Sequence, residues 1–331
     1  MGDTPPVTLK KSVRKDGSRA GWSMLWYALI SMAVSMLWML GETIIRAVIR
    51  TKDITDTAEK DRIFDEVFTY VSEQSGTYMI VGVLVALGFL FLYFRKSGIA
   101  KTMFRSEQKM TPSRFGGIAC AFFGFQIVFQ CGYMLMETLL NLIGYTAESS
   151  MEMASAGSQT VSMFLYAGLI APIVEELVYR GFVLRHLEKY GKLLAVVVSS
   201  ILFGAMHANL PQSIFAFFVG LILGYVAIEY SIKWSIVLHI LNNMVLGDLM
   251  SMALGNCSEF VQNIVFYSVN GLFLLIGIIF CIRRRKKLGE WIRNNMWEKP
   301  EMRWIMTTVG IILFVVLHLL LGISMLEKLV N

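Results

Sequence analysis

The sequence predicts an all-α, polytopic membrane helix bundle, and three observations support this fold class. Hydrophobic residues make up 56% of the 331 residues and charged residues only 16%, against about 25% charged residues in an average soluble domain. The charges are unevenly distributed, because nearly uncharged runs of about 20 residues, long enough to cross a bilayer, recur along the chain. The segments between these runs alternate between strongly basic and mixed or acidic.

We expect about nine transmembrane helices. The apolar runs lie at 22–45, 76–94, 114–136, 160–187, 192–208, 211–230, 233–250, 260–282 and 303–327. They divide the chain into a basic cytoplasmic tail (1–21), accessory spans one to three with their loops (22–159), a core of spans four to seven (160–250) and accessory spans eight and nine (251–331). The mixed-charge stretch 51–75 is interpreted as a solvated loop, with an amphipathic helix as the alternative.

Lysine and arginine gather on one side of this predicted bundle. They are dense in the N-terminal tail, in 95–114, at Lys189 and Lys192, and in 283–287, whereas the loop carrying Glu137, Glu148 and Glu152 has no base. The positive-inside rule then predicts a cytoplasmic N-terminus and an outside C-terminus. Basic cytoplasmic segments account for the net positive charge of the chain, so we expect no binding to nucleic acid. We expect a multi-pass protein of a prokaryotic plasma membrane, in contact with lipid, and the oligomeric state stays open.

Span four contains charges that are costly in lipid. It includes "EELVYR", with Glu175, Glu176 and Arg180, and a charged side chain at mid-bilayer costs at least about 2.5–3.5 kcal/mol. Glu176 and Arg180 are four residues apart with the acid first, the favourable order for a helical ion pair. Glu175 points about 100° away on an α-helix. We therefore expect Arg180 to neutralise Glu176 and Glu175 to be left for another role.

Three further polar side chains fall at a similar depth in neighbouring spans. His207 closes "FGAMH" in span five, about 20 Å outward from Lys192 at 1.5 Å per residue, the depth expected for Glu175. His239 opens "HILNN" in span seven, with Asn243 four residues later on the same helical face. Polar groups buried in lipid face the bundle interior. These residues therefore form a candidate site with Glu175.

Other polar residues of the spans have simpler interpretations. His318 lies in "FVVLHLLLG" without a polar companion, so we expect packing or an interhelical hydrogen bond. His186 and Glu229 are expected at the inner interface, and Asn242 is interpreted as structural. The four cysteines, Cys120, Cys131, Cys257 and Cys281, lack metal-type spacing and indicate no disulfide framework.

The three motifs together resemble the signature of the CPBP family of intramembrane proteases, the type II CAAX prenyl endopeptidases and their prokaryotic relatives. The family pattern is E-E-x-x-x-R, F-x-x-x-H and H-x-x-x-N, which this chain matches with "EELVYR", "FGAMH" and "HILNN" in that order. The resemblance covers about 168–248. It implies an intramembrane endopeptidase acting on a membrane-associated or lipidated (CAAX-type) protein or peptide.

The resemblance also implies a role for each matching residue. Glu175 would be the general base that activates water, and His207 would position that water. His239 and Asn243 would stabilise the oxyanion, a role suited to donors on one helical face. Glu176 and Arg180 would support the base. Removal of a carboxylate from water raises its pKa, which brings its basicity closer to working pH.

Two alternatives remain open from the sequence. The family is often described as metalloproteases, and zinc held by Glu175, His207 and His239 is possible. Since H-E-x-x-H is absent, a glutamate mechanism without a cofactor is favoured. The fold could also serve as a non-proteolytic scaffold or a bacteriocin self-immunity protein. A proton-coupled transporter fits less well, because no Gly/Pro-broken pair of spans recurs in corresponding halves.

Overall fold

The structure, a computed structural model, describes residues 7–155, 158, 160–297 and 299–329. The first half of this part contains α1 (Val7–Thr51), α2 (Thr57–Glu73), α3 (Ser75–Tyr93), α4 (Ile99–Thr102), α5 (Pro112–Leu142), strand β1 (Tyr145–Thr146), α6 (Glu148–Ser155) and α7 (Val161–Leu165). The core follows with the π-helix η1 (Tyr166–Ile170), α8 (Ala171–Glu175), the π-helix η2 (Glu176–Leu184), α9 (Arg185–Leu187) and the 3₁₀ turn η3 (Glu188–Tyr190).

The second half is also helical. It contains α10 (Lys192–Met206), α11 (Leu210–Tyr230), α12 (Ile232–Ile240), the π-helix η4 (Leu241–Leu249), α13 (Met250–Leu254), α14 (Glu259–Asn294), α15 (Lys299–Met306), α16 (Val309–Ser324) and strand β2 (Glu327–Lys328). The two short strands pair antiparallel, which ties the segment after α16 to the segment after α5. The all-α polytopic prediction is confirmed.

Seven helical stretches of the described chain are long and apolar enough to cross a membrane. They are Val7–Thr51, Ser75–Tyr93, Pro112–Leu142, Val161–Tyr190, Leu210–Tyr230, Ile232–Leu254 and Glu259–Asn294. The predicted ninth span, 303–327, is broken: Pro300–Met306 and Val309–Ser324 meet at a bend of 64° and make an eighth span if taken together. Part of this bend packs on α1, where a Cβ placed on Gly21 would lie only 2.2 Å from the backbone nitrogen of Ile311.

The predicted fifth span, 192–208, is not a full span, so the expected count of nine is too high. The helix there, α10, has 15 residues and is about 22 Å long, short of the roughly 30 Å hydrocarbon core. It ends because the chain turns at Ala208, whose φ is +47°, and restarts at α11, which has Pro211 in its first turn. The turn leaves His207 at the end of a helix, inside the bundle.

Two polar segments are more ordered than the sequence predicts. Residues 7–21, expected as a tail, form the first turns of α1, and Val13 and Ala20 are fully buried there. The stretch 51–75 contains α2, so the loop prediction is wrong and the amphipathic alternative is right. Three apolar side chains of α2 repeat every four residues and are buried: Ile63, Val67 and Val71.

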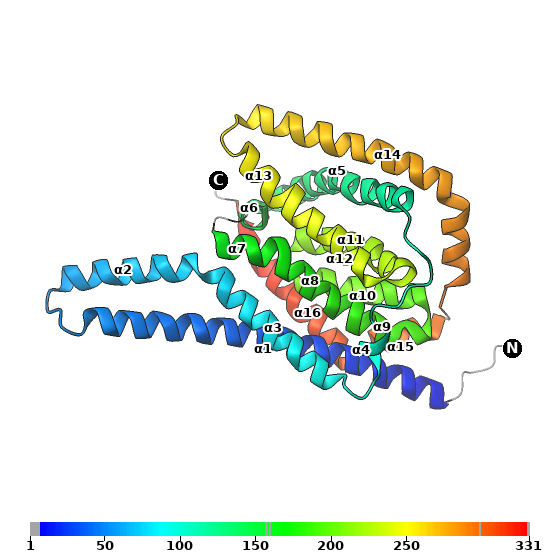
Figure 1. Ribbon diagram of the computed structural model, residues 1–331, viewed down its shortest axis with the longest axis horizontal. Helices are drawn as coiled ribbons and strands as arrows, with labels where there is room; N and C mark the ends of the chain where they lie inside the picture. The colour runs from blue at the N-terminus through cyan, green and yellow to red at the C-terminus, as the bar shows by residue number, and fades with distance from the viewer. Residues whose placement is uncertain (1–6, 156–157, 159, 298, 330–331) are drawn as a thin grey trace.

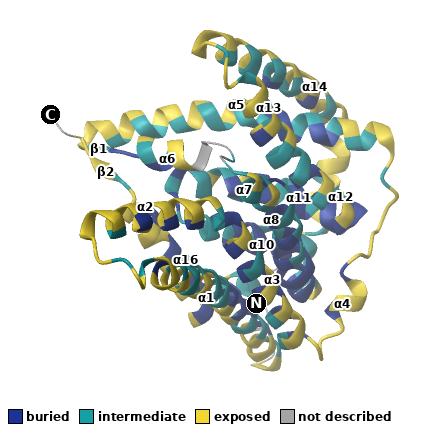
Figure 2. Cartoon of the chain, turned by 60° about the vertical axis from the view of Figure 1, so that its left-hand side comes forward, coloured by how far each residue is buried: buried dark blue, intermediate teal, exposed yellow. Residues whose placement is uncertain are grey.

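The helices form an outer set around a buried core (Figure 1). In this view α5 and α14 lie side by side at the top and α1 and α3 at the bottom, with α8, α10, α11 and α12 between them. The hairpin of α1 and α2 projects to the left. Buried residues concentrate in the central helices, whereas α14 and much of α1 keep exposed apolar side chains (Figure 2). In a membrane protein such outer apolar surfaces face lipid.

Candidate active site

The segments that carry the first and third motifs are wound as π-helix. Glu175 ends α8 and Glu176 begins η2, while η4 follows directly after the α12 helix that contains His239. Pro172 lacks the N–H that would bond to Gly168 in an α-helix, and η1 lies directly before this proline. π-Helical turns occur often at functional sites.

Glu176 and Arg180 form a fully buried ion pair. Oε1 of Glu176 lies 3.0 Å from Nη1 of Arg180, and both side chains have no exposed surface. The angle at Nη1 is not that of a hydrogen bond, so this contact is electrostatic. The guanidinium also lies 4.3 Å from the centre of the Phe203 ring, in the range of a cation–π interaction.

His239 lies between the two adjacent glutamates. Its Nδ1 is 3.0 Å from Oε1 of Glu176, and its Nε2 is 3.6 Å from Oε2 of Glu175. An ionised carboxylate only accepts hydrogen bonds, so Nδ1 carries a proton that it donates to Glu176. The neutral ring then has no proton on Nε2. An N–H directed from Nε2 toward a substrate oxygen requires the doubly protonated ring.

Glu175 differs from its neighbour in both exposure and partners. Its side chain is 26% exposed, whereas that of Glu176 is not exposed at all. Within the described part of the chain, no lysine or arginine nitrogen lies within 4.0 Å of its carboxylate. The structure thus pairs Glu176 with Arg180 and leaves Glu175 beside an imidazole, open to small molecules.

The aromatic ring of Phe203 lies between His207 and His239 and contacts both imidazoles. The ring of Phe203 meets both His207 and His239 edge to face, at centroid distances of 5.0 and 5.8 Å. Nδ1 of His207 lies 2.9 Å from the carbonyl oxygen of Phe203 and donates to it. This bond fixes the tautomer, so that Nε2 of the neutral ring is free to accept a proton from a water molecule.

Asn243 lies in a chain of amide hydrogen bonds. Its Nδ2 donates to the carbonyl oxygen of Ala167 at 3.2 Å, and its Oδ1 accepts from Nδ2 of Asn242 at 3.1 Å. Asn242 in turn accepts from Nε2 of Gln126 at 2.9 Å. Asn242 therefore orients Asn243, and α5 contributes Gln126 to this arrangement, which no motif marks in the sequence.

Three tyrosines that sequence reasoning missed lie near Glu175. Tyr27 of α1, Tyr166 of η1 and Tyr179 of η2 all lie close enough to Glu175 to interact with it electrostatically. Tyr27 and Tyr179 are buried. The "EELVYR" motif contains Tyr179, but the pattern of α1 does not distinguish Tyr27. Only the packing of α1 against the core shows that Tyr27 lies near Glu175.

The remaining polar residues have partners away from this group. His318 is buried and its Nδ1 donates to the carbonyl oxygen of Phe314 at 2.7 Å. His186 lies 3.3 Å from Asp16. Glu229 is buried at the C-terminal end of α11, where its carboxylate accepts hydrogen bonds from Trp291 at 2.7 Å and from Gln108 at 2.8 Å. The hydrogen bond of His318 lies within α16 and is not the interhelical bond offered as one alternative, whereas the contacts of His186 and Glu229 link different segments of the chain.

A metal ion would need three ligands in reach of one point. Glu175, His207 and His239 are donors of types that zinc accepts. Within the residues that the structure describes, however, no group of three or more His, Cys, Asp or Glu is arranged to hold a metal ion. The described residues thus bring Glu175 and His239 together without a third ligand for zinc.

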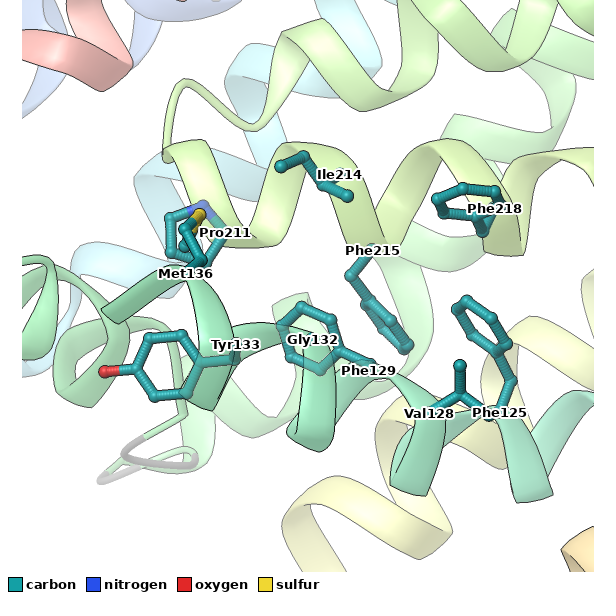
Figure 3. A pocket seen from close by; sticks show the side chains of 10 residues that line it. All are labelled: Phe125, Val128, Phe129, Gly132, Tyr133, Met136, Pro211, Ile214, Phe215 and Phe218. Atoms are coloured by element: carbon teal, nitrogen blue, oxygen red, sulfur yellow. The ribbon is translucent and has the colours of Figure 1, made fainter. Parts of the chain in front are cut away.

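An apolar cavity of about 300 Å³ opens between α5 and α11 (Figure 3). Phe125 and Phe129 of α5 face Phe215 of α11, and Pro211 lies at one end beside Met136. Two lining residues of the cavity are sequence neighbours of residues at or near the polar group. Phe125 precedes Gln126 in α5, and Pro211 follows the turn that begins at His207. Aromatic lining and this volume suit a hydrocarbon chain.

Residues 157–245 match the family described as Type II CAAX prenyl endopeptidase Rce1-like. This is 89 of the 331 residues and includes all three motifs. The resemblance to the CPBP family is confirmed over this segment, which supports a CAAX-type membrane protease. Comparisons with curated proteins and with solved structures returned no match.

Proposed function

We propose that this protein is an intramembrane endopeptidase that uses Glu175 as a general base on water and needs no metal ion. The observation that carries the proposal is the unequal treatment of two adjacent glutamates. Glu176 is buried against Arg180, whereas Glu175 is partly exposed and 3.6 Å from His239. A general base must reach a water molecule and keep a lone pair for its proton. Only Glu175 meets both conditions.

The other motif residues follow from their hydrogen bonds. Because its Nδ1–H donates a hydrogen bond to the Phe203 carbonyl oxygen, His207 accepts a hydrogen bond at Nε2 from one O–H of the attacking water and orients the water oxygen toward the scissile carbonyl. Glu175 takes the other proton as the C–O bond forms. The oxyanion is stabilised by the second N–H of Asn243 and, when His239 is doubly protonated, by its Nε2–H. Each such donor contributes about 3–4 kcal/mol to transition-state stabilisation.

Breakdown of the tetrahedral intermediate requires a proton on the leaving nitrogen. Glu175, now protonated, returns the proton it took from water, the amine leaves and the carboxylate product forms. Glu176 and Arg180 act through His239, because the carboxylate of Glu176 holds the Nδ1 proton in place. They are positioning residues in this scheme.

A lipidated protein or peptide fits the cavity between α5 and α11. The cavity is apolar, and several of its lining residues, among them Val128, Ile214 and Phe218, are partly exposed at the surface of the bundle. A lipid chain arriving from the bilayer enters such a cavity without crossing water. Pro211 of the cavity follows the turn at His207 in the sequence, so a substrate whose lipid occupies the cavity is expected to extend its peptide toward Glu175.

Cleavage assays with a single carboxylate variant test this function. Glu175→Gln should lower kcat for a lipidated reporter peptide by about 10²–10⁴-fold with an unchanged fold, since general-base catalysis contributes that much. Glu148→Gln, at an exposed outer position, is the matched control. Full cleavage by Glu175→Gln would remove the assigned base. An inactive wild type would favour the scaffold or immunity alternative.

The absence of a required metal is tested separately. The purified wild type should keep its activity after prolonged treatment with a strong chelator and removal of the chelated ions. Loss of cleavage that zinc restores would contradict the metal-free mechanism while leaving proteolysis itself intact. The lipid requirement is tested by the same peptide without its lipid, for which KM should rise more than kcat falls.

A further inference from the structure

A second hollow lies at the inner end of the bundle, away from the motif residues. It has a volume of about 340 Å³ and lies between the segment 103–110 and the start of α12. Its walls include Phe104, Ser106 and Lys109 from that segment, and Tyr230, Lys233 and Trp234 from the α11–α12 connection. None of these residues belongs to the three motifs.

The walls of this hollow are held in place by a dense set of hydrogen bonds. Glu229 accepts the backbone N–H groups of Glu107 and Gln108 at 3.1 and 2.8 Å through its carbonyl oxygen. The Ser231 hydroxyl donates to the carbonyl oxygen of Phe104 at 2.9 Å. Ser231 has a φ of +101°, a conformation that L residues adopt at a cost of about 1–3 kcal/mol when the surroundings enforce it. The hollow is thus a fixed feature of the fold.

Three cations at this hollow lack an acidic partner. Lys109 and Lys233 line it, and Arg114 lies beside it with its guanidinium 6.0 Å from the Tyr230 ring. In the described part of the chain, none of the three has a carboxylate oxygen within 4.0 Å.

The acids nearby are already engaged. Glu107 contacts Arg105 and Lys192, and the Glu229 carboxylate accepts from Gln108 and Trp291. The unbalanced positive charge around the hollow is therefore available to an anion from outside the protein.

The position of the hollow indicates the kind of anion. α11 and the span that starts at α12 are both membrane-spanning, and the hollow lies where one ends and the other begins. Tyr225, Tyr230, Trp234 and Trp291 gather at this level, as aromatic residues do at membrane–water interfaces. Phosphate groups of anionic lipids lie at the same level and attract lysine and arginine.

We propose that this hollow binds a phosphate group, supplied by the headgroup of an anionic membrane lipid. Lys109, Lys233 and Arg114 neutralise the phosphate. Ser106, whose hydroxyl donates to no other group in the described residues, adds a hydrogen bond. The lipid tails then lie along the outer faces of α5 and α12, with Phe115 and Trp234, whose rings are in contact at 5.2 Å, below the headgroup. The site involves no proposed catalytic residue.

Lipid binding to charge variants tests the proposal. Wild-type protein in phosphatidylcholine nanodiscs should show a higher Tm when phosphatidylglycerol is included, and native mass spectrometry should retain bound phosphatidylglycerol. The double variant K109Q/K233Q should bind it about tenfold or more weakly, since each lysine near an anionic surface contributes about 1 kcal/mol. The control K286Q/K287Q removes two exposed lysines of α14 and should bind as the wild type does.

The arms of this experiment separate the sources of phosphate. Because all four lysines are exposed, both variants should have the wild-type Tm in phosphatidylcholine alone. If inorganic phosphate in phosphatidylcholine nanodiscs raises the Tm equally and through the same two lysines, the site takes free phosphate and the lipid source is excluded. If both double variants bind phosphatidylglycerol as well as the wild type does, no phosphate site exists at this hollow.

Discussion

Two Glu–Arg pairs in this protein have the same spacing and nearly the same contacts but lie in different surroundings. Glu42 and Arg46 are four residues apart in α1, as Glu176 and Arg180 are in η2. Each glutamate has a second partner at 3.0 Å, Tyr78 for Glu42 and His239 for Glu176. Each arginine lies over an aromatic ring, at 4.1 Å for Arg46 and 4.3 Å for Arg180.

Exposure to solvent separates the two pairs. The side chains of Arg46 and Glu42 are 41% and 22% exposed, whereas those of Arg180 and Glu176 have no exposed surface. Water and salt screen the first pair and replace either partner when it is lost. The second pair has no such replacement, so each member depends on the other. The E-x-x-x-R spacing therefore indicates a helical pair, and only its surroundings decide whether that pair matters to the fold.

Replacement of the arginine should give the largest difference in stability between the two pairs. Arg180→Met leaves Glu176 buried without its cation and should destabilise the protein by about 3–5 kcal/mol. Arg46→Met should leave the free energy of unfolding close to that of the wild type, because water and salt take over from an exposed partner. Denaturant unfolding in detergent measures both. Equal losses of stability would show that burial does not distinguish the pairs.

Removal of the glutamate charge should affect catalysis at one pair only. Glu176→Gln keeps an oxygen that accepts the Nδ1 proton of His239 but no longer neutralises a doubly protonated ring, so kcat should fall on the order of 10²-fold with little change in KM. Glu42→Gln should leave both constants unchanged. A rise in KM alone for Glu176→Gln would mean that Glu176 shapes substrate binding and does not position His239.

Substitution of a tyrosine near each pair, Tyr27 and Tyr70, should give a smaller difference in kcat. Tyr27→Phe removes a hydroxyl near Glu175 and should lower kcat several-fold, about what one hydrogen bond of roughly 1 kcal/mol supplies. Tyr70→Phe, beneath Arg46, is the matched control and should have no effect on kcat. A wild-type kcat for Tyr27→Phe would restrict the role of α1 at the site to packing.

Acid should loosen the exposed hairpin before the core. The hydrogen bond from Arg50 lowers the pKa of Glu66 below its usual 4.5. A carboxyl group with a lowered folded-state pKa stabilises the fold above its unfolded-state pKa, and this contribution is lost as the pH falls through the folded value. Hydrogen exchange, corrected for intrinsic rates, should therefore show α2 losing protection at acid pH while η2 keeps its own. Simultaneous loss in both would contradict a local effect.

The sequence predicts most of the fold because apolar runs and basic segments report directly on membrane insertion. Sequence-based prediction fails where tertiary contacts determine the local structure. A turn at Ala208 shortens α10, and the positive φ that makes this turn has no signal in an alanine. α2 was interpreted as a loop because its buried stripe of Ile63, Val67 and Val71 is narrow and its other faces are charged.

The polar residues of the site can be predicted because burial of a polar side chain in lipid costs free energy. A polar residue within an apolar span therefore indicates a partner or a function. Periodicity places Glu176 with Arg180, and depth places His207 near Glu175. Periodicity and depth do not predict the partners of these residues. Tyr27 is an ordinary aromatic residue in its helix, and the "FGAMH" motif includes Phe203 without showing that its ring contacts both imidazoles. Gln126 becomes part of the site only because α5 packs beside η4, a contact between residues 116 positions apart.

The π-helical winding of η2 and η4 has a consequence for changes of chain length. A π-turn holds one residue more than an α-turn closed by the same number of hydrogen bonds. Loss of one residue from positions 244–249, beyond Asn243, would let that part of η4 return to α-helix, and the later side chains would keep their places. Loss of one residue from α12, which has no such surplus, would rotate Asn243 by about 100° relative to the helix before it. Single-residue deletions should therefore be tolerated in one part of this helix and not in the part that adjoins it.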